Sequence, residues 1–141
     1  MAALSAELRA FLDANRVGVL ATRGKSGLPR QSLVYFAREG ERIVITTLAS
    51  RLKVLDVERT GWASLCVMAH EPPYGSGVFS GPAEILTEDI GVPTAAVMQK
   101  IANLQERPPA QSDEDLAEVG RVVLRIAIDR VSAVSYLGQE S

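Results

Sequence analysis

The sequence is short of the residues on which several kinds of site depend. Cys66 is the only cysteine and His70 the only histidine among 141 residues. A single cysteine excludes an internal disulfide and a thiolate zinc cluster. A single histidine excludes a histidine-rich metal site and leaves a Ser-His-Asp triad only one candidate base. We therefore expect no metal site in this chain.

An excess of one charge and long apolar runs are also missing. The 15 basic and 17 acidic residues give a net charge of −2, whereas non-specific nucleic-acid binding depends on a basic excess. No apolar run approaches the roughly 20 residues that span a bilayer. The N-terminal stretch "MAALSAELRAFLDANR" lacks the apolar centre of a signal peptide. We expect a cytoplasmic protein without nucleic-acid or membrane partners, folded as one domain over residues 1–141.

Hydrophobic periodicity divides the chain into short elements. Apolar residues recur at helical spacing near the N-terminus, which predicts a helix over residues 5–15. Short apolar runs rich in β-branched residues, separated by glycine-containing turns, predict strands at 17–22, 28–36, 43–47, 62–68, 78–86 and 121–129. Six strands joined mostly by short turns, with about three helices, indicate a mainly β fold: an antiparallel six-stranded barrel with peripheral helices.

The later elements carry signals at their ends. Thr87, followed by Glu88 and Asp89, predicts the capped start of a helix that continues to about residue 105. A short helix is expected after Ser112. The pair Gly81–Pro82 interrupts the fifth strand and suggests a bulge or an edge there.

The stretch "TTLASRLKVLDVER" predicts a strand end, a short turn and then a helix, with two cations at the helix start. Free N–H groups give a helix start partial positive charge, so Arg51 and Lys53 are unfavourable there by a few tenths of a kcal/mol each. One interpretation is that both are solvated surface charges. The other is an anion site, in which the N–H groups and the two cations bind a phosphate together.

The neighbouring polar residues fit either interpretation. Ser50 could cap the helix and add a hydroxyl donor. Thr46 and Thr47 end the preceding strand, where their hydroxyl and N–H groups could bind the polar edge of a ligand. Both threonines are also explained by ordinary β propensity.

Two longer stretches resemble a known family. "GVLATRGKSGLPRQSLVYF" followed by "IVITTLASRLKVLDVERTGWASLCV" is similar to the pyridoxamine 5'-phosphate oxidase-like split β-barrel superfamily, and more closely to its coenzyme F420 (deazaflavin)-dependent oxidoreductase branch. The similarity covers roughly residues 17–86, with a matching last strand at 121–134. Its most specific part is the strand, Thr-Thr, short turn and "SRLK" segment.

The resemblance implies a function and a set of cofactor contacts. In the family the "SRLK" segment binds the phosphate of F420 or FMN, and the second strand lies along the flavin ring, in a site built at a homodimer interface. Carried over, this implies an F420-dependent oxidoreductase that transfers a hydride to an unsaturated or quinone-like substrate. The cofactor contacts it implies are Gln31, Ser32, Leu33, Val34, Thr46, Thr47, Ser50, Arg51 and Lys53. Tyr74 is added as a contact from the loop after the fourth strand, where it could cover the cofactor.

Two other functions remain open at this stage. One is an FMN-binding oxidase or reductase on the same fold. The other is a protein that stores, senses or carries a flavin or a haem without turnover. No residue is identified as a catalytic acid, and fold alone does not decide among the three functions.

The chain also departs from the family. Asp56 stands where the family usually has Asn, so its carboxylate should point away from a bound phosphate or pair with Arg51 or Lys53. The C-terminus "VSYLGQES" lacks the basic substrate motif of pyridoxamine phosphate oxidases proper. The charged tail of F420 would need further cations, for which Arg23, Lys25 and Arg30 are candidates, although the simpler explanation of all three is that they are solvated hairpin charges.

The remaining candidates have simple structural explanations. His70 is expected to be a loop residue, with a proton-donor role as the alternative. Tyr74 either covers a ligand or packs. Trp62 is expected in the core or at an interface, and Cys66 is expected to be buried and inert. We expect Val34, Tyr35 and Phe36 to form an apolar patch that a homodimer covers.

Overall fold

The computed structural model of the chain describes residues 3–135. Twelve elements follow one another in this part of the chain: α1 Ala6–Ala14, β1 Val17–Arg23, β2 Pro29–Tyr35, β3 Ala37–Glu39, β4 Arg42–Leu48, α2 Leu52–Thr60, β5 Trp62–Met68, β6 Ser76–Leu86, α3 Gly91–Ile101, α4 Asp113–Glu118, β7 Arg121–Ala127 and β8 Arg130–Ser135. Within these residues no helix is long and apolar enough to cross a membrane.

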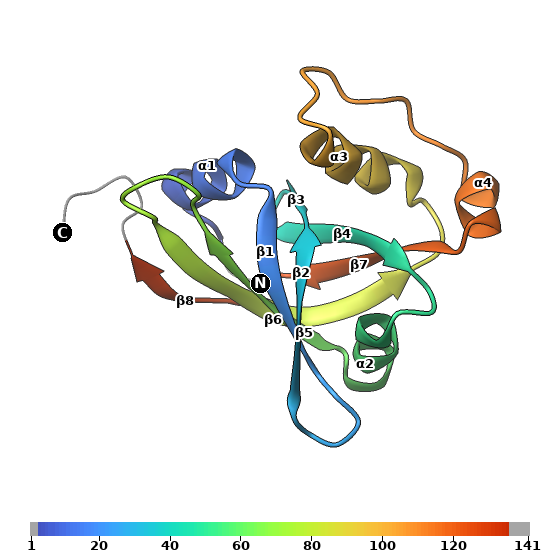
Figure 1. The fold of residues 1–141 in the computed structure, drawn as a ribbon, viewed down its shortest axis with the longest axis horizontal. Coiled ribbons are helices and arrows are strands. Elements are labelled where there is room, and N and C mark those ends of the chain that lie inside the picture. Colours follow the sequence, from blue (N-terminus) through green and yellow to red (C-terminus); the bar gives the residue numbers. More distant parts are fainter. Residues whose placement is uncertain (1–2, 136–141) are drawn as a thin grey trace.

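The strands form one curved antiparallel sheet in the order β2-β1-β5-β6-β7-β4-β3, with β8 paired to β6 (Figure 1). This confirms the mainly β split barrel. The expected number of six strands was too low for the described residues. The polar turn after β2 contains the short strand β3, and the expected last strand is divided into β7 and β8. Between the two strands, the N–H groups of Ile128 and Asp129 donate to the carbonyls of Glu41 and Ser80, and the chain passes from pairing with β4 and the end of β6 to pairing with the start of β6.

Strand β6 joins the two halves of the barrel. It pairs with β5 up to Pro82 and with β7 from Ala83 onward. A Cβ atom at Gly81 would lie 2.0 Å from the carbonyl oxygen of Ala127, so only glycine allows this close approach. The pair Gly81–Pro82 therefore marks the exchange of strand partner, and the strand continues through it.

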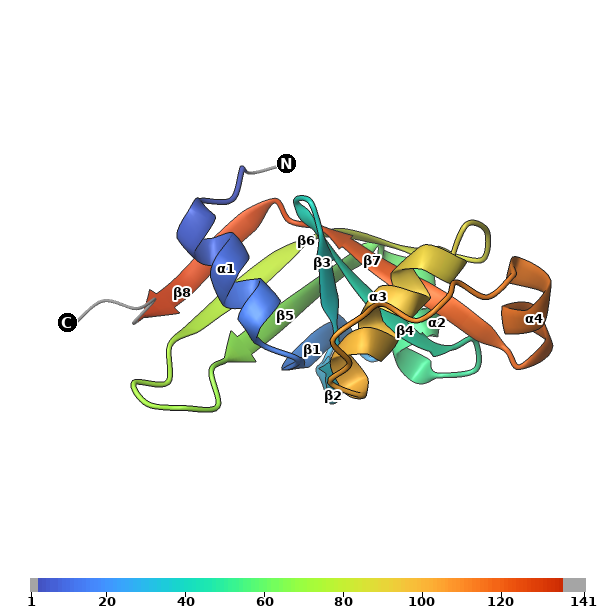
Figure 2. The same cartoon turned by 90° about the horizontal axis from the view of Figure 1, so that it is seen from above.

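Apolar side chains pack on both sides of β4. Ile43 and Ile45 lie inside the barrel with the main core cluster, whereas Val44 packs into a second cluster beneath α3 and α4. Figure 2 shows α3 lying over β4 and α1 lying over the β5–β6 side. Helix α2 lies at the other end of the molecule, below the barrel in Figure 1.

Two helices begin at a nearby serine cap, whereas α3 does not. Ser5 accepts a hydrogen bond from Leu8 N–H at the start of α1, and Ser112 does the same for Asp115 at the start of α4. Both helices therefore begin close to where the sequence predicts them. A helix also forms in the segment where the sequence predicts α3, but the predicted start at Thr87 was wrong. That helix begins at Gly91 without a side-chain cap and ends at Ile101.

Asp113 explains the shifted start of α3. Its carboxylate accepts hydrogen bonds from the N–H groups of Asp89, at 2.8 Å, and Ile90, at 3.1 Å. Asp89 adopts a φ of 54°, which breaks the helical path before Gly91. Thr87 and Glu88 therefore lie outside the helix that they were expected to begin.

Candidate functional site

The chain turns sharply between β4 and α2, and Arg51 stands at the turn. Its backbone is extended, its N–H donates to the carbonyl of Leu48 at 3.0 Å, and it occupies the N-cap position of α2 without a side-chain cap bond. The expected cap at Ser50 was therefore wrong, because the helix begins one residue later. Lys53 is the second residue of the helix, so both cations lie at its N-terminal end.

Positive charge at this helix start is not compensated. The first turn of α2 holds no acidic residue, and among residues 3–135 neither Arg51 nor Lys53 forms an ion pair or side-chain hydrogen bond. Burial lowers the pKa of Lys53, and the nearby charge of Arg51 lowers this pKa further. An anion bound here would relieve the repulsion between Arg51 and Lys53. It would also accept hydrogen bonds from the unpaired N–H groups of the first turn.

Asp56, one turn further along α2, does not supply the missing negative charge. Its carboxylate accepts hydrogen bonds from Thr22 Oγ1 at 2.9 Å, Arg30 Nε at 2.7 Å and Arg59 Nη1 at 3.3 Å. Pairing with Arg51 or Lys53, one of the two expected arrangements, is therefore wrong. Burial alone would raise the pKa of Asp56, but its hydrogen bonds with Arg30, Thr22 and Arg59 outweigh burial and lower the pKa.

The same contacts change how one candidate residue for the F420 tail, Arg30, is interpreted. Arg30 is held by Asp56, and Arg59 also donates to the carbonyl of Arg23. Arg30 therefore stabilises the junction between β2 and α2. The exposed side chains of Arg23 and Lys25 remain available in and beside the β1–β2 turn.

The four candidate contacts on β2 point to two faces, because successive side chains of a strand alternate. Gln31 and Leu33 are exposed on the outer face of the barrel, whereas Val34 is buried and Ser32 is half-buried. A ligand on the outer face therefore meets the first pair through side chains. It would meet Ser32 and Val34 only through the backbone.

Thr46 and Thr47 are likewise on opposite faces of β4. Thr47 is buried on the same side as Ile45. Thr46 shares the face of Val44, and its Oγ1 is buried without a hydrogen-bond partner among the described residues. A buried hydroxyl without a partner is costly, so Thr46 has an unused capacity to donate or accept a hydrogen bond.

The loop between β5 and β6 carries the other candidates. Tyr74 is 51% exposed and has a φ of 54°, and His70 is exposed. Because α2 ends directly before β5 and this loop directly follows it, the strand separates Tyr74 from α2 within one chain. The structure therefore does not bring Tyr74 together with Arg51 and Lys53.

The outer face of β1, β2 and β5 is apolar and exposed. Leu33 is 75% exposed, and Val17, Tyr35, Cys66 and Met68 are exposed as well. The expectation of a buried Cys66 was wrong, because the side chain lies on the outward face of β5. Val34 and Phe36 are buried in the core and do not belong to the exposed patch, whereas Tyr35 does.

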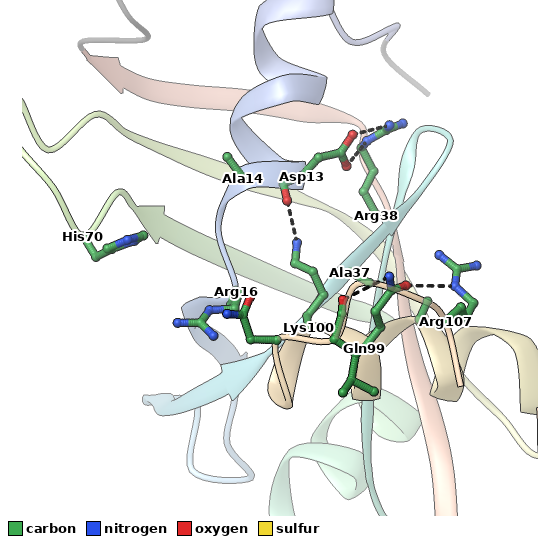
Figure 3. Close-up of a pocket in the computed structure, with 12 residues that line it drawn as sticks. Asp13, Ala14, Arg16, Ala37, Arg38, His70, Gln99, Lys100 and Arg107 are labelled. Atoms are coloured by element: carbon green, nitrogen blue, oxygen red, sulfur yellow. Dashed lines mark hydrogen bonds and ion pairs between the residues drawn. The ribbon is translucent and has the colours of Figure 1, made fainter. Parts of the chain in front are cut away.

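A cavity that the sequence did not indicate lies at the end of the molecule opposite α2. Its volume is about 570 Å³, and it is bounded by the end of α1, by β3 and by α3 (Figure 3). Four cationic side chains line it: Arg16, Arg38, Lys100 and Arg107. They come from four separate segments of the chain, so no local sequence pattern could have identified them.

Comparisons with known proteins agree with the fold. A conserved hypothetical protein from Mycobacterium tuberculosis aligns with a TM-score of 0.76 at 23% identity, covering 100% of this chain and 91% of that one. A protein described as an F420 reductase aligns with a TM-score of 0.70 at 22% identity, covering 88% of this chain and 94% of that one. These two similarities establish the fold alone.

A FAD-binding protein from Mesorhizobium loti is more similar in sequence. It aligns with a TM-score of 0.66 at 29% identity, covering 91% of this chain and 92% of that one. Among curated protein sequences, none shows significant similarity to this chain. The sequence profile described as pyridoxamine 5'-phosphate oxidase matches residues 4–135, nearly the whole chain. The protein therefore belongs to the pyridoxamine 5'-phosphate oxidase family.

Proposed function

We propose that this protein is an oxidoreductase that binds a flavin-type cofactor by its phosphate at Arg51 and Lys53. The observation that carries the proposal is the pair of uncompensated cations at the start of α2. Arginine suits bidentate contact with phosphate oxygens, and lysine supplies a point charge. The residues present thus fit a phosphate group, and the family to which the chain belongs supports the same ligand.

The chain's own contribution is to bind and position the cofactor. The outer face of β2, with Leu33 and Tyr35 exposed, offers an apolar surface beside which a planar ring system can lie. The cofactor, when bound, supplies the hydride chemistry. Its substrate in this proposal is an unsaturated or quinone-like organic molecule, and no side chain is assigned as the catalytic acid.

F420 is the cofactor we propose first, on the resemblance of the "SRLK" segment to the deazaflavin branch. The similarity to a protein described as an F420 reductase is compatible with this choice. FMN is the second candidate. One observation favours a flavin over a deazaflavin: the neighbour described as FAD-binding has a higher sequence identity than the one described as an F420 reductase, 29% against 22%.

We further propose that the protein works as a homodimer. The exposed apolar face formed by Val17, Leu33, Tyr35, Cys66 and Met68 is larger than isolated surface residues explain. A two-fold contact through this face would bury it and would bring a second chain beside β2. A cofactor lying along β2 would then be covered by both chains.

A fluorescence titration tests the proposed function. The purified protein is titrated with F420 and, separately, with FMN, and the bound cofactor is offered candidate quinones and enones. The proposal predicts saturable binding of one cofactor and reoxidation of its reduced form by a substrate. Binding of neither cofactor would contradict it. Tight binding without any turnover would instead support a storage or carrier protein.

A further inference from the structure

The cavity opposite α2 concentrates positive charge in an acidic chain. The chain as a whole carries a net charge of −2, yet the charged side chains lining this cavity are four cations and one carboxylate, Asp13. A volume of about 570 Å³ falls within the usual range of small-molecule sites, about 300–1,000 Å³.

The one carboxylate is already committed. Asp13 receives two hydrogen bonds from Arg38, at 2.9 and 2.8 Å, in a bidentate ion pair. The carboxylate of Glu41 also acts on Arg38 from outside the cavity, but it is itself bonded to Arg9 and to the N–H of Leu4. Arg38 is therefore neutralised, whereas the other cations of the cavity are not.

Lys100 lies among these cations without an acidic hydrogen-bond partner. Its Nζ donates to the carbonyls of Leu12 at 3.1 Å and Asp13 at 3.2 Å, which end α1, and lies 5.0 Å from the centre of the Phe36 ring. Burial lowers the pKa of Lys100, and although Asp13 raises this pKa, Arg16 and Arg38 lower it further. Lys100 is thus close enough to Arg16 and Arg38 to be repelled by both.

Neither Arg16 nor Arg107 forms an ion pair with any other residue in the part of the chain that the structure describes. Both side chains are exposed, and within residues 3–135 the side chain of Arg107 donates one hydrogen bond, to the amide oxygen of Gln99 at 3.3 Å. Figure 3 shows Arg16 on one side of Lys100 and Arg107 on the other. His70, Gln99 and Asn103 add polar groups that can hydrogen-bond to a ligand.

We propose that this cavity binds the carboxylate or phosphate group of a small organic anion, held by Lys100, Arg16 and Arg107. Such an anion would relieve the repulsion between Lys100 and Arg16 and would accept charge-assisted hydrogen bonds from all three side chains. This site is separate from the one at Arg51 and Lys53, because the two lie at opposite ends of the same strands.

The lengths of strands β1 and β4 indicate how far apart the two sites lie. Arg16 directly precedes β1, whereas Thr22 and Arg23 at the far end of β1 contact α2. Likewise β4 begins beside β3, which carries Arg38, and ends three residues before Arg51. Seven residues in an extended strand span roughly 20 Å.

The position of the cavity suggests whether the bound anionic group belongs to the cofactor or to the substrate. This inference rests on the proposed function. A cofactor fixed by its phosphate at Arg51 and extended along β2 points its ring toward the cavity and its phosphate side away from it. The anion bound in the cavity is then the charged end of the substrate. The substrate class narrows to unsaturated or quinone-like molecules that carry a carboxylate or phosphate.

Nitrogen-15 NMR without any cofactor tests the site itself. Inorganic phosphate and succinate are titrated separately into the protein, and amide shifts are followed at Arg16, Ala37 and Lys100. Saturable shifts there are expected for at least one of the two anions. Absence of shifts for both, up to tens of millimolar, would overturn the proposal whether or not the protein binds a flavin.

Matched variants locate the binding. Arg16→Gln with Arg107→Gln should weaken anion binding in the cavity about tenfold or more, because two charge-assisted contacts are lost. The control, Arg23→Gln with Lys25→Gln, removes the same charge from the β1–β2 turn and should leave the cavity shifts unchanged. Equal weakening in both double variants would show a general charge effect and would overturn the assignment.

Saturation with cofactor tests the substrate role. With F420 or FMN bound, succinate or phosphate should still shift the cavity amides. If the cofactor itself displaces the anion from the cavity, the cavity holds part of the cofactor and the substrate role is wrong. If neither cofactor binds, the proposed function fails while the anion site is still judged by the cofactor-free titration.

Discussion

Asp56 carries its charge in a place that water scarcely reaches. Its side chain is 2% exposed and joins α2 to β1 through Thr22 and to β2 through Arg30. Removing one partner of a buried ion pair costs several kcal/mol because the other is left without compensation. Here both arginine partners are more than one third exposed, so water replaces part of the lost interaction.

We expect Asp56→Asn to lower the free energy of unfolding by about 3 kcal/mol, the low end of the range for a broken buried pair. Because the pKa of Asp56 is lowered in the folded protein, the ionised carboxylate stabilises the fold above the unfolded pKa of about 3.9, and this stability is lost as the pH falls through the folded pKa.

Urea unfolding at pH 7 and at decreasing acidic pH measures both effects. The gap between parent and Asp56→Asn should narrow as the pH falls. Glu58→Gln, an exposed carboxylate on the same helix, is the control and should change stability little. A gap that stays constant down to the lowest pH would contradict the role given to the ionised carboxylate.

At the scale of elements, prediction from sequence succeeded where the deciding contact is local. The helices predicted near Ser5 and Ser112 are present. Each of these serines accepts a hydrogen bond from an N–H group only three residues further along the chain. The start of α3 was missed because its N–H acceptor, Asp113, lies 24 residues beyond Asp89. Turn and cap patterns contain no information about such distant acceptors.

The strands show a second limit. In β5 the run "WASLCVM" reads as uniformly apolar, yet its side chains alternate between the core and the surface, with Cys66 and Met68 outside. When both faces of a strand are apolar, the sequence alone does not show which face is buried in the core and which is exposed. The cluster around Lys100 was missed because it is assembled from distant segments.

The β1–β2 turn carries a prediction about cofactor choice. With Arg30 held by Asp56, Arg23 and Lys25 are the cations left for the charged tail of F420. Lys25→Glu should weaken F420 binding, leave FMN binding nearly unchanged, and have a smaller effect as salt rises, because exposed charges are screened. Fluorescence titrations at low and high salt measure this. Equal weakening for both cofactors would indicate a general electrostatic effect.

At the scale of the whole molecule, the exposed sheet face predicts the assembly. Leu33→Glu should separate the proposed dimer, because a carboxylate would be buried within the apolar face. The side chain is 75% exposed in one chain, so the fold itself should be unaffected. Light scattering should give twice the chain mass of 15.1 kDa for the parent and the single mass for the variant.

The matched control for this experiment is Leu28→Glu, which changes an equally exposed leucine in the β1–β2 turn, outside the apolar face. It should remain dimeric. A parent protein that is monomeric at micromolar concentration with cofactor present would contradict the dimer and the cofactor cover that it provides.

The central claim is that Arg51 and Lys53 hold the cofactor phosphate, and one binding measurement tests it most directly. F420 and FMN are titrated into the parent and into the double variant Arg51→Ala with Lys53→Ala, with circular dichroism as the check on folding. Losing two charge-assisted contacts should weaken binding by about 2–4 kcal/mol, less than the sum of two independent losses. The fold should persist, because these cations are unfavourable at a helix start. Double-variant affinities equal to those of the parent for both cofactors would contradict the claim.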